Sequence, residues 1–289
     1  EMAKQLEIAG FDALHIDAGC YESHYWSHPP NYQKHGCMID LPAQARDFLK
    51  IPVIGVGRLD KPEVATKALE DNKVDFVAIG RGLLADPQWP DKVKSGQHLD
   101  IRPCVGCYDG CFASYYKYRN ISCALNPASG RERAYRLEPV SKSLNVLVIG
   151  GGVAGMEAAR VAALRGNHVS LYEKQSTLGG LVQQAAVPEF KKDLRRLLAW
   201  FERQIEKTGV EVFLNNEISV AEIRDKAPDV TIVATGARSL KPSIPGIDRD
   251  NVFTAVDVLK GEQTVGNHSV IVGGGLVGCE IAIWLADQQ

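Results

Sequence analysis

The sequence predicts an α/β fold in which parallel strands alternate with helices. Three observations support this prediction. Residues 1–100 contain repeated strand–loop–helix units, residues 101–143 form a segment with closely spaced cysteines, and glycine-rich turns follow apolar strands in residues 144–240 and 241–289. Almost continuous apolar strands between helices are typical of a parallel sheet that is covered on both faces. We therefore expect two parallel α/β regions separated by a cysteine segment.

Three strand–loop–helix units occupy the first hundred residues. Apolar strands are predicted at 11–17, 51–56 and 75–79, and helices at 41–50 and 62–71. Each unit takes about 30 residues, whereas a closed (β/α)8 barrel takes roughly 250. We therefore interpret residues 1–100 as the last three units of such a barrel.

A glycine–arginine pair follows each of the last two predicted strands, as Gly57-Arg58 and Gly80-Arg81. Barrel enzymes commonly bind phosphate through the loops after strands seven and eight. Glycine lets backbone N–H groups approach a phosphate, and arginine offers a planar fork to its oxygens. The alternative is a glycine at a tight turn beside an arginine in a surface ion pair. Equivalent positions in two loops favour phosphate binding.

The loop after the first strand, residues 18–30, is rich in side chains that hydrogen-bond or stack. On a barrel this loop would lie on the catalytic face. We expect it to face the substrate, although a loop packed down by its own aromatic residues is the alternative.

Four cysteines follow with the spacing C-x2-C-x3-C-x11-C, namely Cys104, Cys107, Cys111 and Cys123. Thiolates select zinc or iron–sulfur clusters. The usual zinc module pairs two CxxC knuckles, or one CxxC with two histidines, and this stretch has neither. The spacing favours a [4Fe–4S] cluster, with a structural zinc site and a set of buried free thiols as alternatives.

The strand predicted at 145–149 runs directly into a G-x-G-x-x-G turn, followed by a helix to about residue 165 and a strand at 168–173. In this context Gly150 makes the turn, Gly152 admits a pyrophosphate and Gly155 lets helix and strand pack closely. Glu173 ends the second strand at the spacing of a ribose-binding acid. Residues 144–240 therefore predict a Rossmann-like dinucleotide-binding domain, with a core-facing helix at 189–207 and a buried strand at 230–236.

A second fingerprint of the same kind appears at 269–278, with Gly273, Gly275 and Gly278 in the glycine positions. A strand is expected before it and a helix after it. Tandem fingerprints suggest FAD on the first and NAD(P)H on the second, with residues 241–289 forming the start of the second domain.

Composition limits the remaining possibilities. A net charge near −2 argues against nucleic acid or an anionic membrane as a main partner. No apolar run reaches the roughly 18 residues of a bilayer span, and no signal peptide is evident, so we expect a cytoplasmic protein with reduced thiols. The chain opens and closes inside helix-like runs, which suggests a fragment of a longer protein.

Together, residues 53–58 and 80–87, the spaced cysteines with Asn126-Pro127, and the glycine turn at 150–155 resemble one group of proteins. This group is the old yellow enzyme-like iron–sulfur flavoenzymes, which include 2-enoate reductases, 2,4-dienoyl-CoA reductases, the bile-acid 4-desaturase type and trimethylamine dehydrogenase. The resemblance implies an FMN-bearing barrel, a [4Fe–4S] cluster and an FAD/NAD(P)H module.

By motif match, the resemblance implies roles for individual residues. The FMN phosphate would be held by Gly57, Arg58, Gly80 and Arg81, the cluster by the four cysteines, and FAD by Gly150, Gly152, Ala154, Gly155, Glu173 and Gly180. NAD(P)H would lie on Gly273, Gly275 and Gly278. Tyr21 stands where the dienoyl-CoA reductases carry a histidine, and its loop is more similar to the enoate reductase and bile-acid branch.

The expected activity is NAD(P)H-dependent reduction, or formation, of an activated C=C bond in an enoate, enoyl-CoA or enone. Electrons would pass from NAD(P)H to FAD, the cluster, FMN and then the small unsaturated substrate, with Tyr21 as a proton donor or a hydrogen-bond partner of the substrate carbonyl. The rivals are an amine demethylase similar to trimethylamine dehydrogenase and a zinc-stapled nucleotide-binding module without catalysis. A homo-oligomer is compatible with either activity.

Overall fold

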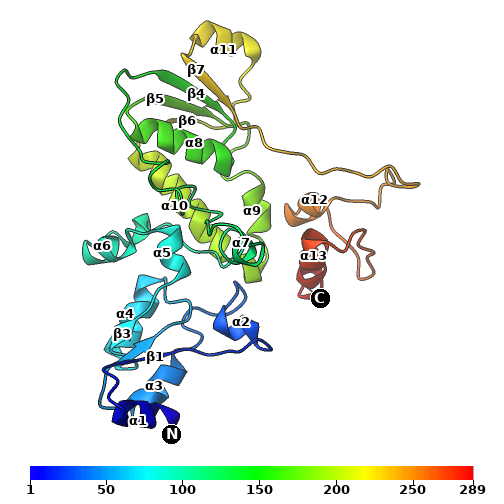
Figure 1. The fold of residues 1–289 in the computed structure, drawn as a ribbon. Coiled ribbons are helices and arrows are strands. Elements are labelled where there is room, and N and C mark those ends of the chain that lie inside the picture. Colours follow the sequence, from blue (N-terminus) through cyan, green and yellow to red (C-terminus); the bar gives the residue numbers. More distant parts are fainter. Residues whose placement is uncertain (289) are drawn as a thin grey trace. The chain divides into compact units, whose positions relative to one another are not determined.

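The computed structural model describes residues 1–288 and divides the chain into two compact units, Glu1–Leu137 and Glu138–Gln289 (Figure 1). Each unit contains its own parallel sheet. The predicted α/β class with parallel sheets is therefore confirmed.

The sheet of the first unit contains β1 (Leu14–Ile16), β2 (Val53–Gly55) and β3 (Phe76–Val77), in that spatial order and all parallel. Leu14 pairs with Val53, and Ile54 pairs with Phe76. The three strands lie where the sequence predicts them but are shorter. Because parallel strands point the same way, the loops that follow them leave the sheet at one edge.

Helices connect and follow these strands. They are α1 (Met2–Ile8), α2 (His24–Ser27), α3 (Asp40–Arg46), α4 (Pro62–Glu70), α5 (Arg81–Ala85), α6 (Trp89–Lys94), the 3-10 helix η1 (His98–Asp100) and α7 (Phe112–Tyr116). Proline in the first turn suits the start of α4, because that position needs no donated hydrogen bond. Leu59, Ala65, Trp89 and Ile101 form a buried cluster, against which Ile39, Val64, Val77, Ile79 and Val93 pack.

The sheet of the second unit has the order β6-β5-β4-β7, again all parallel. Its strands are β4 (Asn145–Ile149), β5 (His168–Tyr172), β6 (Glu211–Phe213) and β7 (Val230–Val233). The two central strands carry the core, and Val148 and Leu171 are fully buried.

The helices of this unit are α8 (Val153–Leu164), α9 (Leu181–Ala185), the 3-10 helix η2 (Glu189–Lys191), α10 (Asp193–Lys207), α11 (Val220–Lys226), α12 (Ala255–Leu259) and α13 (Leu276–Ala286). The apolar stripe of α10 packs inward as predicted, with Leu197, Phe201 and Ile205 buried. No helix in the described part of the chain is long and apolar enough to cross a bilayer.

Two sequence expectations are wrong in detail. The strand at 230–236 is not buried: β7 lies at one end of the order β6-β5-β4-β7, and Val233 is 68% exposed. A strand at the edge of a sheet lacks a neighbour on one side. Residues 269–272 form no strand, because a strand requires pairing and the structure pairs no neighbour with them among residues 1–288. The helix expected after them is present as α13.

Candidate functional site

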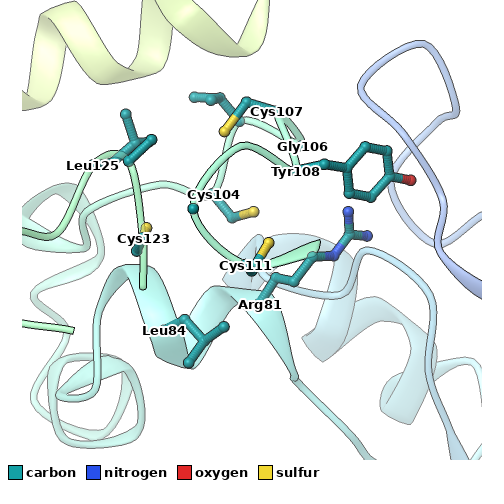
Figure 2. A pocket seen from close by; sticks show the side chains of 12 residues that line it. Arg81, Leu84, Cys104, Gly106, Cys107, Tyr108, Cys111, Cys123 and Leu125 are labelled. Carbon is teal, nitrogen blue, oxygen red and sulfur yellow. The ribbon is translucent and has the colours of Figure 1, made fainter. Parts of the chain in front are cut away.

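The four cysteines line one pocket, together with Arg81, Leu84, Val105 and residues around them (Figure 2). They come from two segments of the first unit: three lie in residues 104–111, and Cys123 arrives from a separate loop. Figure 2 shows their sulfur atoms around the same space, with Leu84 and Leu125 on its wall. The spacing read from the sequence therefore brings the four thiols together.

Glycine allows the two cysteine segments to approach each other. A Cβ atom on Gly110 would lie 2.7 Å from the backbone nitrogen of Ala124 and 2.8 Å from the Cα of Cys123. Ser122 donates a backbone hydrogen bond of 2.9 Å to the carbonyl of Gly110. The fourth cysteine is therefore held beside the first three by main-chain contacts that a larger residue at position 110 would break.

Hydrogen bonds fix the loop that follows the fourth cysteine, Cys123. Asn126 donates through Nδ2 to the carbonyl of Leu84 at 2.9 Å, and Arg102 donates through Nη1 to the carbonyl of Leu125 at 2.7 Å. Buried Asp86 accepts from the backbone nitrogen of Arg102 at 2.8 Å. These contacts position Leu125 and Asn126 directly after Cys123.

Burial dominates the electrostatics of the pocket. It raises the pKa of the Cys104 thiol to about 12, with the nearby Asp60 carboxylate adding to the effect and the Arg81 cation opposing it. Burial also raises the pKa of Cys107. A metal that binds these sulfurs must displace their protons. Within residues 1–288, no three His, Cys, Asp or Glu side chains share the geometry of a single-ion site.

Arg81 belongs both to this pocket and to the second glycine–arginine loop. Its Nη2 donates to the carbonyl of Pro29 at 2.7 Å, and its guanidinium lies 5.1 Å from the centre of the Tyr108 ring. Nη1 is buried and, among the described residues, finds no hydrogen-bond partner. A buried N–H group without an acceptor is costly, so Nη1 is a position where a ligand oxygen or sulfur would be stabilised.

Arg58 behaves differently. Its side chain is buried, and its Nη1 is surrounded by the carbonyl oxygens of Pro30 at 3.0 Å, Asn31 at 2.9 Å and Gln33. Its Nη2 lies 3.1 Å from Nε2 of His35. The guanidinium that the sequence assigns to a phosphate is thus directed into the loop after β1.

The loop after β1 packs against the cysteine segment through aromatic rings. The His28 ring lies 3.9 Å from the Phe112 ring, between centroids, and the Tyr108 hydroxyl donates to the carbonyl of His28. Burial lowers the pKa of His28, and the charges of His24 and Arg81 lower it further. Tyr21, in contrast, is 96% exposed at the tip of the loop. Its sequence-predicted role therefore depends on a substrate that reaches this exposed position.

Tyr108 and Phe112 were not singled out by the sequence. Each directly follows a cysteine of the motif, at 107 and at 111, and this adjacency was the available signal. Because an aromatic residue next to a ligand is common in any packed loop, the adjacency alone could not have shown that both rings contact the loop after β1.

The first glycine turn has the geometry of a nucleotide-binding loop. Gly150 has φ 106°, and a Cβ atom on Gly155 would lie 1.8 Å from the carbonyl oxygen of Gly150. The side chain of Glu173 is buried beside the turn and accepts from the backbone nitrogen of Gly151 at 2.6 Å. A Cβ atom on Gly152 would lie 4.0 Å from the Cα of Gly180. Ala154 is exposed on the first turn of α8. The structure therefore gathers the predicted residues around the start of α8.

The second glycine turn repeats the first. Gly273 has φ 115°, and a Cβ atom on Gly278 would lie 1.9 Å from the carbonyl oxygen of Gly273. Gly275 is extended and caps α13, as Gly152 is extended and caps α8. Both turns can thus present backbone N–H groups and a helix start to a diphosphate.

Two family models match the chain in succession. Residues 2–100 match the NADH:flavin oxidoreductase / NADH oxidase family, and residues 144–289 match the pyridine nucleotide-disulphide oxidoreductases. The chain belongs to the NADH:flavin oxidoreductase family, in its form with a pyridine-nucleotide module. The resemblance inferred from the sequence is confirmed.

Similar proteins match along the whole chain. A cinnamate reductase from Clostridium sporogenes is 44% identical over 100% of this chain, and an NADH oxidase from Thermoanaerobacter brockii is 40% identical over the same extent. A solved 2-naphthoyl-CoA reductase in complex with 2-naphthoyl-CoA superposes with a TM-score of 0.95 at 33% identity, covering 99% of this chain. The chain spans 43–45% of the length of these three proteins.

Proposed function

We propose that the protein containing this chain is an NAD(P)H-dependent flavin oxidoreductase that reduces the activated C=C bond of a conjugated carboxylic acid or its acyl-CoA thioester. The similarity to cinnamate reductase over the whole chain supports the reaction class, as does the fold shared with 2-naphthoyl-CoA reductase. Both of these proteins are named for an unsaturated, conjugated acyl group.

One structural observation supports the arrangement of cofactors. Arg81 lines the pocket of the four cysteines and at the same time lies in the glycine–arginine loop after β3. A phosphate bound by that loop and a cluster bound by those cysteines would therefore be neighbours. When bound, the two flavins and the cluster would supply the electron path between nicotinamide and substrate.

The cysteine pocket fits a [4Fe–4S] cluster in its chemistry. Four thiols line one space, and each cubane iron takes one cysteine ligand. Leu84, Val105 and Leu125 make part of the wall apolar. In this proposal Cys104, Cys107, Cys111 and Cys123 each hold one iron.

The nucleotide sites follow from the two glycine turns. FAD would bind at Gly150, Gly152, Ala154, Gly155 and Gly180, with Glu173 accepting from a ribose hydroxyl. NAD(P)H would bind at Gly273, Gly275 and Gly278. The FMN phosphate would bind at the backbone N–H groups of Gly57, Arg58 and Gly80 and at the free Nη1 of Arg81. Tyr21 would contact the substrate from the loop after β1.

The test uses the intact protein, purified without oxygen. We expect FMN, FAD, iron and acid-labile sulfide in the ratio 1:1:4:4, and NADH oxidation that depends on cinnamate or a related acyl-CoA and yields the saturated product. Cys104→Ser should lose the iron, whereas Cys279→Ser, outside the pocket, should retain it. Absence of iron and sulfide from the wild-type protein would refute the cluster. NADH oxidation without a saturated product would refute the proposed reaction.

A further inference from the structure

The two glycine–arginine loops look equivalent in the sequence, but their side chains are used differently. Both amino groups of Arg58 contact residues of the chain itself, whereas Nη1 of Arg81 lacks a partner in the described part of the chain. An arginine whose donors are already satisfied gains little from a phosphate. An arginine with a buried, unsatisfied donor gains much more.

We propose that Arg58 is a positioning residue that holds the substrate-facing loop, residues 17–35, while Arg81 alone supplies a guanidinium to the flavin phosphate. This inference rests on the proposed function, because it takes the loop after β1 to face the substrate. In this inference the side chain of Arg58 supports the loop and does not bind the cofactor.

The backbone of Arg58 has an unusual conformation. Gly57 has φ 115° and Arg58 has φ 52°, so the chain turns through two successive left-handed residues after β2. A non-glycine residue in this conformation is strained and persists where its surroundings determine it. The arginine side chain that leaves this turn reaches the carbonyls of Pro30, Asn31 and Gln33 in the loop after β1.

A buried chain of hydrogen bonds runs from the Arg58 guanidinium through His35 to Asp60. Arginine can only donate, so Nε2 of His35 must accept from Nη2 of Arg58 at 3.1 Å. The proton of a neutral His35 therefore resides on Nδ1, which lies 3.2 Å from Oδ1 of Asp60 and 3.2 Å from the carbonyl of Arg58. Asp60 is itself fixed, since its carbonyl accepts from Trp89 at 2.8 Å. The orientation of Arg58 is thus set from the core of the unit.

The contacts of Arg58 and Arg81 lie on neighbouring residues at the base of the loop after β1. The carbonyls of Pro30, Asn31 and Gln33 are consecutive or nearly so, and Arg81 holds the preceding carbonyl, that of Pro29. These carbonyls follow α2, which carries His24, and lie downstream of Tyr21 in the same loop. Loss of the Arg58 fork would therefore free the base of the loop.

Lysine at position 58 separates the two roles, because it keeps the positive charge but offers one nitrogen in place of a planar fork. The experiment compares Arg58→Lys and Arg81→Lys in the intact protein. It measures the dissociation constant of FMN by flavin fluorescence, amide hydrogen exchange of residues 31–36 by mass spectrometry, and KM and kcat for cinnamate.

We expect Arg58→Lys to speed amide exchange in residues 31–36 at least tenfold and to raise KM at least tenfold, with the FMN dissociation constant within about threefold of the wild-type value. Arg81→Lys should weaken FMN binding at least tenfold. If Arg58→Lys weakens FMN binding as much as Arg81→Lys does, or leaves the exchange unchanged, the proposal is overturned.

A milder variant guards against a folding defect. His35→Asn removes the imidazole that orients Arg58 but leaves the arginine in place, and it should give the same pattern with smaller changes. The outcomes also separate this inference from the proposed function. If the wild-type protein reduces no alkene, the proposed reaction fails, yet the exchange and FMN measurements still decide the role of Arg58.

Discussion

Nε2 of His24 and the hydroxyl oxygen of Tyr116 lie 2.6 Å apart, and this hydrogen bond joins α2 to α7. The helix α7 begins directly after Cys111, so the loop after β1 is attached to the segment that carries the cysteines. The loop that would contact substrate and the residues that would bind the cluster therefore form one packed structure within the first unit.

Phe112 is central to that packing, because its ring contacts those of His24, His28, Tyr108 and Tyr116. Phe112→Ala should destabilise the first unit by about 2 kcal/mol, less than a fully buried phenylalanine would cost because Phe112 is only half-buried. Urea unfolding followed by tryptophan fluorescence measures this change. Tyr115→Ala is the matched control, since Tyr115 is exposed. If Phe112→Ala lowers the free energy of unfolding no more than this control does, Phe112 is not central to the packing.

Asn126 should control the retention of iron. Asn126→Ala removes the 2.9 Å bond to the carbonyl of Leu84 and the 3.2 Å bond that Oδ1 accepts from the backbone nitrogen of Ala128. Each such bond contributes about 1 kcal/mol, so the loss of both should make the release of iron to a chelator roughly 30-fold faster. The exposed Asn120→Ala provides the comparison. Equal release rates in the two variants would show that the anchor does not hold the cluster loop.

Substitutions in the two glycine turns should cause different defects, one in FAD binding and the other in reduction by NADH. Alanine at Gly155 or Gly278 would place Cβ within 2 Å of a carbonyl oxygen, at 1.8 and 1.9 Å respectively, so the turn must open. Gly155→Ala should purify without FAD. Gly278→Ala should keep FAD but be reduced by NADH at least tenfold more slowly in anaerobic stopped-flow measurements, while dithionite still reduces it.

Gly266→Ala is the control for both variants, because a Cβ atom there meets no heavy atom within 4 Å. Reduction of Gly278→Ala by NADH at the wild-type rate would show that the second turn does not bind the nicotinamide nucleotide.

Asp75 should make the first unit sensitive to acid. The hydrogen bond from Arg46 holds the pKa of the Asp75 carboxyl below its usual value, and the bond from the backbone nitrogen of Val53 adds to this. A lowered pKa in the folded state stabilises the fold above the unfolded pKa of about 3.9, and this contribution disappears as the pH falls through the folded value.

The free energy of unfolding of the wild-type protein should therefore exceed that of Asp75→Asn at pH 7 and approach it below pH 4. Urea titrations at several pH values measure the difference. Asp71→Asn, in the exposed pair with Lys67, should show little change at any pH. A wild-type advantage over Asp75→Asn that persists at pH 2 would contradict the electrostatic origin.

The sequence predicted best where local geometry and chemistry coincide. The strand β4 begins and ends at the expected residues, Asn145 and Ile149, because an apolar run that ends in a glycine turn leaves little choice of boundary. The four cysteines meet in one pocket as their spacing indicates. In both cases the deciding residues are close together in the chain.

Contacts between distant residues could not be predicted in the same way. Arg58 and its acceptors in residues 30–33 are 25 to 28 positions apart, and no periodicity in the sequence links them. The exposure of β7 depends on the spatial order of the strands, which its apolar composition does not encode. Both differences arise from tertiary arrangement, which overrides a local pattern.

The left-handed backbone of Arg58 has a consequence for protein engineering. Glycine or asparagine at this position would relieve the strain of the positive φ. Such variants would lose the guanidinium that gathers the carbonyls of Pro30, Asn31 and Gln33. Screens of this protein should therefore keep residue 58 constant, because three carbonyls that lose their donor destabilise the fold more than relief of the backbone strain stabilises it.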